Sequence, residues 1–468
     1  MNTTTSFNGS RGLRYPAPDV ARGFMLLLIA LANVGFWSYG TGRFTPSTAD
    51  RIWAFINALF IHERAYPLFA MLFGFGLATM VNRRIASGTE SYLQSLPGVE
   101  AGREPTEQEE AWAREQATVG ARRLVRRRGL WMILFGLVHG VFFPSEIIGA
   151  YGIVAVVFAG WFARKHHKRQ LAVCALVLLF QVVPVLLSMF SGPDGGAAAS
   201  TAASTAPTAA APTDSAESVL STLPWFVTNV GEWFSLAVGV AFTTMVLPAA
   251  FLGARLADTD LIAHPERHRG LLAAVGLGGL ALGALGALHE ILVPFTSAQS
   301  WEIDSTLIMV LGLPGGCGWL ALLALYAGGP TSDGRLTGLK WLLAAVGRRS
   351  MTAYLSQTLM FGTIFVIMPR LTENPLELGM AASAAVAAVV WLVTVGVCAV
   401  LERLGEPGPF EALLRTAVVS GERSRMMPTT PSPSPRHSAR PLAQPVRVQA
   451  PIALADNKAA GRHVLAGV

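Results

Sequence analysis

Residues 19–39, DVARGFMLLLIALANVGFWSY, form an apolar stretch that decides what kind of protein this chain folds into. Apart from Asp19 and Arg22 near its start, the stretch contains no charged side chain. A run of about 20 apolar residues is what an α-helix needs to cross the hydrocarbon layer of a membrane. Residues 1–18 are mostly polar, and no small-residue cleavage site follows the stretch. We therefore predict a retained transmembrane helix rather than a signal peptide.

Similar apolar stretches recur along most of the chain. Hydrophobic residues make up 52% of the sequence and charged residues 14%, against roughly 25% charged in a soluble domain. Strands of a membrane β-barrel would alternate apolar and polar residues, whereas these stretches are continuous. We predict an all-α, polytopic membrane helical bundle with about ten transmembrane helices. The predicted spans are residues 19–39, 53–81, 130–143, 147–162, 171–190, 233–256, 271–293, 306–326, 341–368 and 378–401.

Arginine and lysine gather in alternate connections between these spans. They are concentrated in segments 83–128, 164–169, 255–269 and 335–340 and in the tail after residue 401, whereas segment 191–220 has none. Because basic connections stay on the cytoplasmic side, both termini are expected in the cytoplasm of a multi-pass protein of the cell (plasma) membrane. The predicted domains are a cytoplasmic N-terminal segment (1–18), a transmembrane domain (19–420) and a disordered cytoplasmic tail (421–468).

Two connections within the transmembrane domain have a distinctive composition. Segment 191–220 is mostly Ala, Thr, Ser and Pro, which predicts a flexible outer loop. In the cytoplasmic loop 83–128, Thr106 and Glu109 have the spacing of a capping box. We expect a short polar helix there that runs towards Arg128.

Several kinds of partner are disfavoured by the sequence. Cys174, Cys317 and Cys398 lie within predicted spans without metal-ligand spacing, so no metal site is predicted. The net charge of +7 comes from inter-helix segments with no basic patch interleaved with aromatics, which argues against nucleic acid. The lipid bilayer is the partner that the composition predicts.

One group of ionisable residues lies at the inner ends of the spans. Asp19 and Arg22 are three residues apart and can pair on one helix face, and Arg348 with Arg349 opens the ninth span from the same side. This basic cluster either holds a phosphate-bearing ligand or anchors the helices at the membrane surface.

Uncharged donors follow the arginine pair along the ninth span. Thr352, Tyr354 and Gln357 lie within two turns of Arg348. They either orient a ligand or join neighbouring helices by hydrogen bonds.

A second polar group lies deeper in the predicted membrane. At 1.5 Å per residue, Asn33 is roughly 21 Å beyond Asp19 and His139 is roughly 16 Å beyond Arg128, which places both in the outer half. Histidine is the natural general base for a hydroxyl or amine nucleophile, and His139 is the candidate for that role. The alternative for His139 is a hydrogen bond between packed helices.

Charges also interrupt the second span. His62, Glu63 and Arg64 precede Tyr66-Pro67, which predicts a broken helix whose freed backbone lines a cavity. By contrast, Glu146 with Tyr151, and His289 with Glu290, fall near outer helix ends and are expected to face water.

Taken in order, five motifs resemble the YeiB-like integral membrane family, named for a domain of unknown function (418). They are DVARG at 19–23, ANV at 32–34, YPLFAMLFGFG at 66–76, FGLVHG at 135–140 and GRRSMTAYLSQ at 347–357. The family is similar to transmembrane acyltransferases, which pass an acyl group from cytoplasmic acyl-coenzyme A to an acceptor on the other face. Some of these enzymes carry a histidine where this chain has Asn33, so the resemblance moves that role to His139 or His62.

The resemblance therefore implies acyl transfer to a glycan, lipid or small-molecule acceptor, with acyl-coenzyme A as co-substrate and no tightly bound cofactor. The inner cluster would hold the phosphates, and Arg64 or Asn33 would stabilise the oxyanion. A secondary transporter is the first alternative, although only the short echo of MLFG and ILFG, at 71–74 and 133–136, hints at the internal repeat of such proteins. A non-catalytic membrane scaffold is the second.

Overall fold

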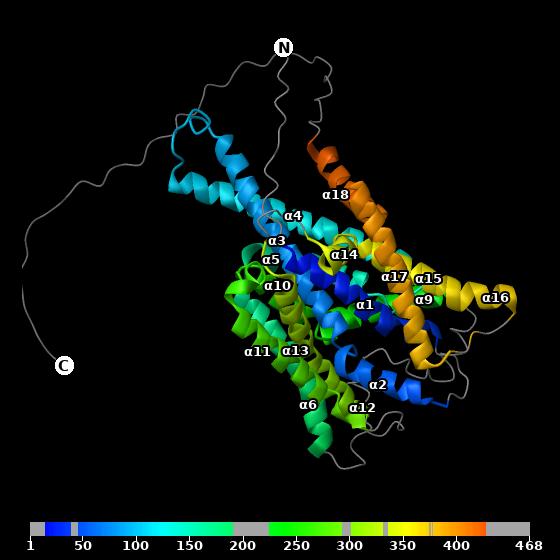
Figure 1. The fold of residues 1–468 in the computed structure, drawn as a ribbon. Helices are drawn as coiled ribbons and strands as arrows, with labels where there is room; N and C mark the ends of the chain where they lie inside the picture. The colour runs from blue at the N-terminus through cyan, green and yellow to red at the C-terminus, as the bar shows by residue number, and fades with distance from the viewer. Residues whose placement is uncertain are drawn as a thin grey trace, which may run out of the picture. The chain divides into compact units, whose positions relative to one another are not determined.

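A computed structural model describes residues 15–38, 45–190, 224–292, 301–330, 336–373, 376 and 378–426, and these contain helices and no strand (Figure 1). The chain divides into a unit Met1–Glu422 and a unit Arg423–Val468, and the account below concerns the first. The predicted all-α membrane bundle is confirmed. Most of the predicted N-terminal segment, the outer loop and nearly all of the tail lie outside the described residues.

Each predicted span coincides with at least one helix. Among the described residues, seven helical segments are long and apolar enough to cross a membrane, so the count of ten and the orientation of the termini stay predictions. The helices are α1 (Ala17–Ser38), α2 (Thr48–Phe60), α3 (Ala65–Gln94), α4 (Glu107–Gly140), α5 (Ile148–Arg164), α6 (His167–Phe190), α9 (Trp225–Thr243), α10 (Val246–Leu256), α11 (Arg269–Gly286), α12 (Leu288–Leu292), α13 (Trp301–Ala327), α14 (Gly338–Arg348), α15 (Ser350–Gly362), α16 (Met368–Thr372), α17 (Met380–Leu404) and α18 (Pro409–Met426). A 3₁₀ turn covers Pro265–Arg267, and a π-helical turn covers Thr363–Ile367 between α15 and α16.

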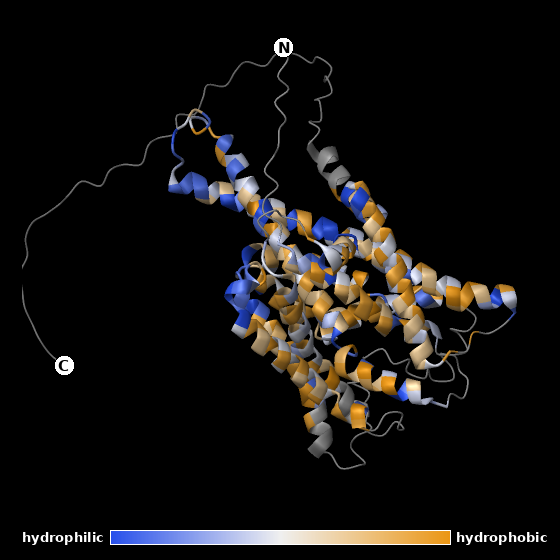
Figure 2. Ribbon diagram, viewed as in Figure 1, coloured by the Kyte–Doolittle hydropathy of each residue, from blue (hydrophilic) through white to orange (hydrophobic). Residues whose placement is uncertain are grey.

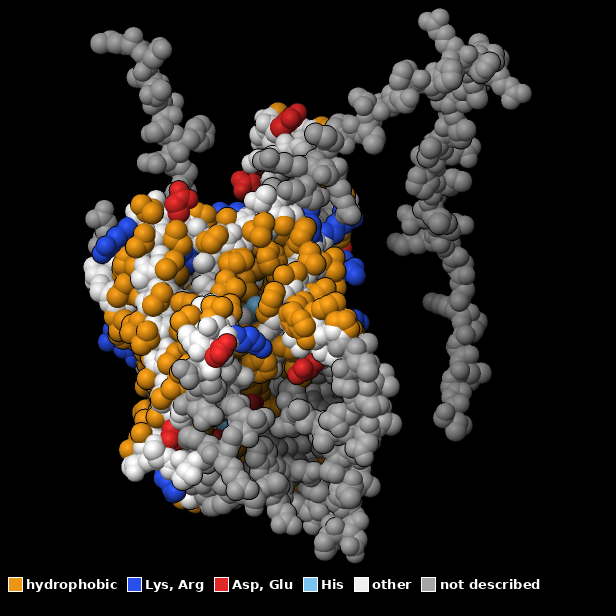
Figure 3. Space-filling view, turned by 90° about the vertical axis from the view of Figure 1, so that its right-hand side faces the viewer, with side chains coloured by type: hydrophobic (Ala, Val, Ile, Leu, Met, Phe, Trp, Pro, Cys, Tyr) orange, Lys and Arg blue, Asp and Glu red, His pale blue; other side chains and the backbone are white. Residues whose placement is uncertain are grey.

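The outside of the bundle is apolar. Large side chains such as Leu171, Leu277 and Leu359 are exposed, and hydrophobic side chains cover much of the face in Figure 3. Hydrophilic residues gather instead at the tip of the α3–α4 hairpin, shown in blue in Figure 2. An extensive exposed apolar surface is unfavourable in water and is what a bilayer-embedded surface requires.

Glycines allow neighbouring helices to touch backbone to backbone. A Cβ added to Gly74 of α3 would lie 1.9 Å from the Ala250 carbonyl oxygen of α10, and one added to Gly253 would lie 1.9 Å from the Met71 oxygen. Any larger side chain at either position would push α3 and α10 apart. Such close approach is how helices gain packing energy in lipid, where burial of apolar surface drives little association.

The predicted break in the second span is confirmed. Helix α2 ends at Phe60, α3 begins at Ala65, and Glu63 between them has the left-handed φ of 57°. Three spans predicted as continuous are broken as well, at Thr244–Met245, at Ala287 and at Arg349. At these points local polar groups replace the lost helical bonds, for example the Thr244 hydroxyl that accepts from the Val246 N–H at 3.2 Å.

The capping box at Thr106 is confirmed, but the short helix is wrong. The Thr106 hydroxyl accepts from the Glu109 N–H at 3.3 Å, and the Glu109 carboxylate accepts from the Thr106 N–H at 2.8 Å. The helix that begins there runs without interruption for 34 residues to Gly140. No proline stands between the polar first half and the apolar second half of α4, so a single helix contains both.

Candidate functional site

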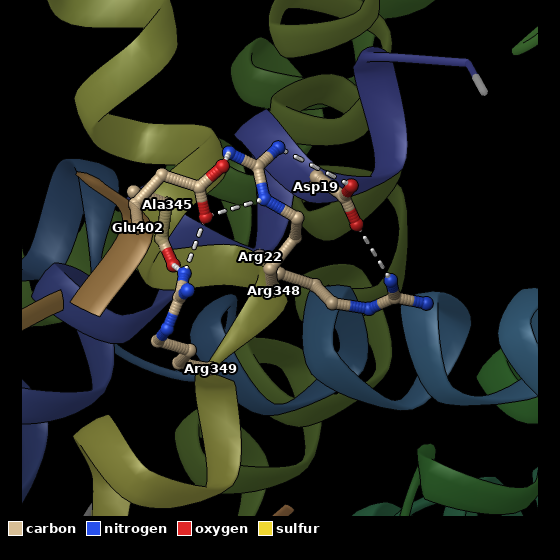
Figure 4. A network of polar contacts seen from close by, with 6 residues as sticks. All are labelled: Asp19, Arg22, Ala345, Arg348, Arg349 and Glu402. Atoms are coloured by element: carbon tan, nitrogen blue, oxygen red, sulfur yellow. Dashed lines mark hydrogen bonds and ion pairs between the residues drawn. The ribbon is translucent and has the colours of Figure 1, made fainter. Parts of the chain in front are cut away.

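The inner arginines form a closed network with two carboxylates (Figure 4). Arg348 donates from Nε and Nη2 to the two Glu402 oxygens at 3.1 and 2.6 Å, and Arg349 donates to the same carboxylate at 2.5 Å. Asp19 pairs with Arg22 at 3.4 Å and with Arg348 at 3.9 Å. Helices α1, α14 and α17 are thereby joined at one end of the bundle.

Backbone carbonyls take up further donors of this network. Arg22 donates to the Leu72 oxygen of α3 at 3.1 Å. Arg349 donates to the Ala345 oxygen at 3.3 Å and to the Glu406 oxygen through both Nε and Nη2. Phosphate binding and anchoring were the two roles predicted for this cluster, and the contacts that are present join one helix to another.

The break before α15 is capped by the chain that follows α17. The Glu411 carboxylate accepts from the N–H groups of Met351 and Thr352 at 2.7 and 3.1 Å and from the Thr352 hydroxyl at 2.5 Å. A carboxylate at a helix N-terminus satisfies free N–H groups and complements the helix dipole. The segment after residue 401 therefore helps to hold the ninth span in its broken form.

A separate centre forms around His139 near the end of α4. The ring is 7% exposed and lies edge-on to Tyr354 of α15, with 5.3 Å between the ring centroids. Its Nδ1 is 3.9 Å from the Glu146 carboxylate, which is beyond hydrogen-bond range. Within the described chain, neither ring nitrogen has a hydrogen-bond partner, and the Tyr354 hydroxyl lies beside the Asn33 side chain.

Glu146 is held in place by three donors. It accepts from the N–H groups of Ile148 and Gly149 at 2.6 and 2.9 Å, at the start of α5, and from the Trp233 indole at 2.5 Å. The side chain is 1% exposed, so the expectation that Glu146 faces water is wrong. Tyr151 is buried too, because it packs against Phe69 and Phe73 of α3.

Glycines make the room that this carboxylate occupies. A Cβ on Gly136 would lie 2.5 Å from a Glu146 oxygen, and one on Gly140 would lie 2.2 Å from the Trp233 ring. A Cβ on Gly149 would meet both side chains. The glycines of the motif FGLVHG were a signal in the sequence for large side chains packed against this part of α4, and Glu146 and Trp233 are those side chains.

The charged triplet between α2 and α3 forms a third centre. His62 is 2.9 Å from Glu290 of α12 and 4.0 Å from Glu63, while Arg64 turns inward, is 1% exposed and donates to the His62 carbonyl at 2.6 Å. The structure thus brings Asn33, His139 and Tyr354 together. His62 and Arg64 contact a different set of helices, and Gln357 donates to the Leu26 carbonyl at 3.4 Å.

The chain resembles one family model over part of its length and two curated proteins. The model of the family described as "Protein of unknown function (DUF418)" matches residues 256–420. "Uncharacterized protein YxaH" of Bacillus subtilis (strain 168) is 25% identical over 425 residues, which cover 85% of this chain and 92% of that protein. The "Uncharacterized 39.9 kDa protein in amylase 3'region" of Bacillus acidopullulyticus is 23% identical over 176 residues, 36% of this chain and 40% of that protein. No solved structure matches.

Proposed function

We propose that this integral membrane protein, whose residues 256–420 match the DUF418 family as the sequence motifs predicted, is an acyltransferase of the cell (plasma) membrane. It would move an acyl group from cytoplasmic acyl-coenzyme A to a glycan, lipid or small molecule on the other face. The observation that carries the proposal is the buried His139, with the Glu146 carboxylate 3.9 Å from its Nδ1, because a nearby carboxylate favours the protonated form that a histidine reaches when it acts as a general base.

Acyl transfer needs one proton carrier and one group that stabilises the oxyanion. His139 takes the proton of the acceptor hydroxyl as the oxygen attacks the thioester carbonyl, and Glu146 stabilises the imidazolium that forms. Tyr354 and Asn33 are the neighbouring donors for the oxyanion. The tetrahedral intermediate collapses, the carbon–sulfur bond breaks, and the thiolate leaves with the proton from His139.

The donor's phosphates would need positive charge on the cytoplasmic side. Asp19 and Glu402 already pair with Arg22, Arg348 and Arg349, whereas Arg122, Arg123 and Arg126 of α4 are exposed. In this proposal the exposed arginines attract the phosphates first, and the network behind them fixes the helices. His139 is nearly enclosed, so the acceptor reaches it when the surrounding helices part.

The test replaces the proposed base. His139→Gln should lower the rate of coenzyme A release by the purified protein by about 10²- to 10⁴-fold, the usual contribution of a general base. His166→Gln, in the turn between α5 and α6, is the matched control and should keep full activity. Mass spectrometry of surface lipids and glycans, with and without the protein, then identifies the acceptor by an added acyl mass.

Equal activity of His139→Gln and the unmodified protein would overturn the proposal. A secondary transporter is the alternative, and the breaks at residues 61–64, 244–245 and 349 favour it because interrupted spans are common in transporters. Uptake or export of a substrate that depends on an ion gradient and leaves the substrate covalently unchanged would show that the protein is a transporter.

A further inference from the structure

Arg64 is a buried cation whose hydrogen bonds are incomplete. Its Nη1 donates to the His62 carbonyl, but within the described chain Nε and Nη2 have no hydrogen-bond partner. The residue is 1% exposed, so bulk water does not supply the missing acceptors. A buried charge with unused donors is strongly unfavourable, so we infer that Nε and Nη2 have a hydrogen-bond acceptor from outside the chain.

Arg348 is an example of the same guanidinium edge with its acceptors in place. Its Nε and Nη2 donate to the two oxygens of Glu402 at 3.1 and 2.6 Å. The same two nitrogens are the unused ones in Arg64. A guanidinium edge matches a planar carboxylate with two parallel hydrogen bonds, so the missing partner has the geometry of a carboxylate.

The protein's own carboxylates do not fill this place. Glu290 and Glu63 are the acidic groups that act electrostatically on Arg64, yet neither forms an ion pair with it among the described residues. Both lie against His62 instead, and both are about one-third exposed, at 34% and 29% of the side chain. They therefore offer negative charge next to Arg64 without neutralising it.

Glycines of α11 and α13 face the unused edge. A Cβ on Gly283 would lie 2.8 Å from Nε and 3.3 Å from Nη2, and one on Gly315 would lie 3.1 Å from Nε. No side chain of these two residues can compete for the guanidinium, and a substitution at Gly283 would press on the two nitrogens. The edge is thus bordered by the backbone of α11 and α13.

We propose that Arg64 binds the carboxylate of a small zwitterionic ligand whose cationic group lies against Glu63 and Glu290. A doubly charged phosphate is disfavoured, because two carboxylates stand beside the single guanidinium. A simple cation would leave Nε and Nη2 unused. A zwitterion supplies both complements and adds no net charge to a site inside the membrane. This site is distinct from the His139 centre and does not rest on acyl transfer.

The test uses the full-length protein in lipid nanodiscs and follows its thermal unfolding. The probes are L-alanine, acetate, ethylamine and inorganic phosphate at equal millimolar concentrations. We expect L-alanine to raise Tm most and acetate less, with no shift from ethylamine or phosphate. Arg64→Lys keeps the charge but loses the planar edge, so it should weaken apparent L-alanine binding by about tenfold or more.

Two further variants keep the result interpretable if Arg64→Lys folds poorly. Gly283→Ala retains Arg64 but crowds its edge and should also weaken L-alanine binding, whereas Glu290→Gln should abolish the preference for L-alanine over acetate. The exposed Arg370→Lys is the matched control. Absence of any shift, a shift from phosphate alone, or an L-alanine shift that persists in Arg64→Lys and Gly283→Ala would overturn the proposal.

Discussion

Two groups of arginines within the apolar spans of this protein have opposite surroundings. Where α1, α14 and α17 meet, the half-buried Arg348 and the buried Arg349 share the Glu402 carboxylate, and Arg349 also reaches two backbone carbonyls. At the break between α2 and α3, Arg64 is at least as deeply buried but has a single acceptor, the His62 carbonyl. Composition and hydropathy cannot separate these cases, because each is an arginine within an apolar span.

The difference separates structural charge from charge available to a ligand. A guanidinium with its acceptors in place holds helices together and has little left to offer. A guanidinium with unused donors raises the free energy of the folded protein, and a ligand that supplies the acceptors lowers it again. Substitutions at Glu402, at the buried arginines and at an exposed arginine should therefore differ in their effect on stability, in that order from largest to smallest.

Removing the shared carboxylate should have the largest effect. Glu402→Ala leaves Arg348 and Arg349 without their strongest acceptor in a mostly buried place, so we expect a loss of about 3–5 kcal/mol. Reversible unfolding in mixed detergent micelles measures this free energy. A loss below about 1 kcal/mol would mean that water compensates the arginines, and the inner network would no longer count as structural.

Replacing an arginine by methionine should act in opposite directions at the two places. Arg349→Met strands the Glu406 carbonyl and weakens the hold on Glu402, so it should destabilise the protein by about 2–3 kcal/mol. Arg64→Met removes a charge with unused donors and should leave the ligand-free protein equally stable or up to about 3 kcal/mol more stable. The same unfolding assay compares the two variants. Equal destabilisation would show that Arg64 is as well satisfied as Arg349.

An exposed arginine should matter least. Arg103 pairs with Glu109 at 2.8 Å in the α3–α4 hairpin, and this bond, with help from the Thr106 N–H, lowers the Glu109 pKa to about 2. Because the folded-state pKa is depressed, the cap is fully present above pH 4.5 and is lost as pH falls towards 2. Arg103→Met should leave Tm nearly unchanged and move the loss of the cap to higher pH.

Hydrogen exchange of the first turn of α4 measures this shift. In the unmodified protein the amides after Thr106 should stay protected at pH 4, and in Arg103→Met the protection should already be reduced there. Identical pH profiles would show that the backbone cap, rather than Arg103, sets the Glu109 pKa.

Much of the architecture followed from local pattern. Each of the ten predicted spans contains helix, the break at His62–Arg64 was indicated by its charges and the following proline, and the cap at Thr106 by its spacing. The breaks at Thr244, Ala287 and Arg349 were not predicted, and the bonds that cap the break at Arg349 come from a distant residue, Glu411.

The sequence by itself determined that the chain is a bundle of apolar helices. Hydropathy and helix length are local properties, and they decide whether a segment is stable in a bilayer. It also identified His139 and Arg64 as ionisable side chains whose placement in lipid has an unfavourable free energy. Only the tertiary structure decided what surrounds each of these polar groups: Glu146 turns inward and lies 3.9 Å from His139, Glu402 pairs with two arginines, and Arg64 keeps two donors unused. Partnership depends on contacts between helices far apart in the chain, and no local pattern encodes them.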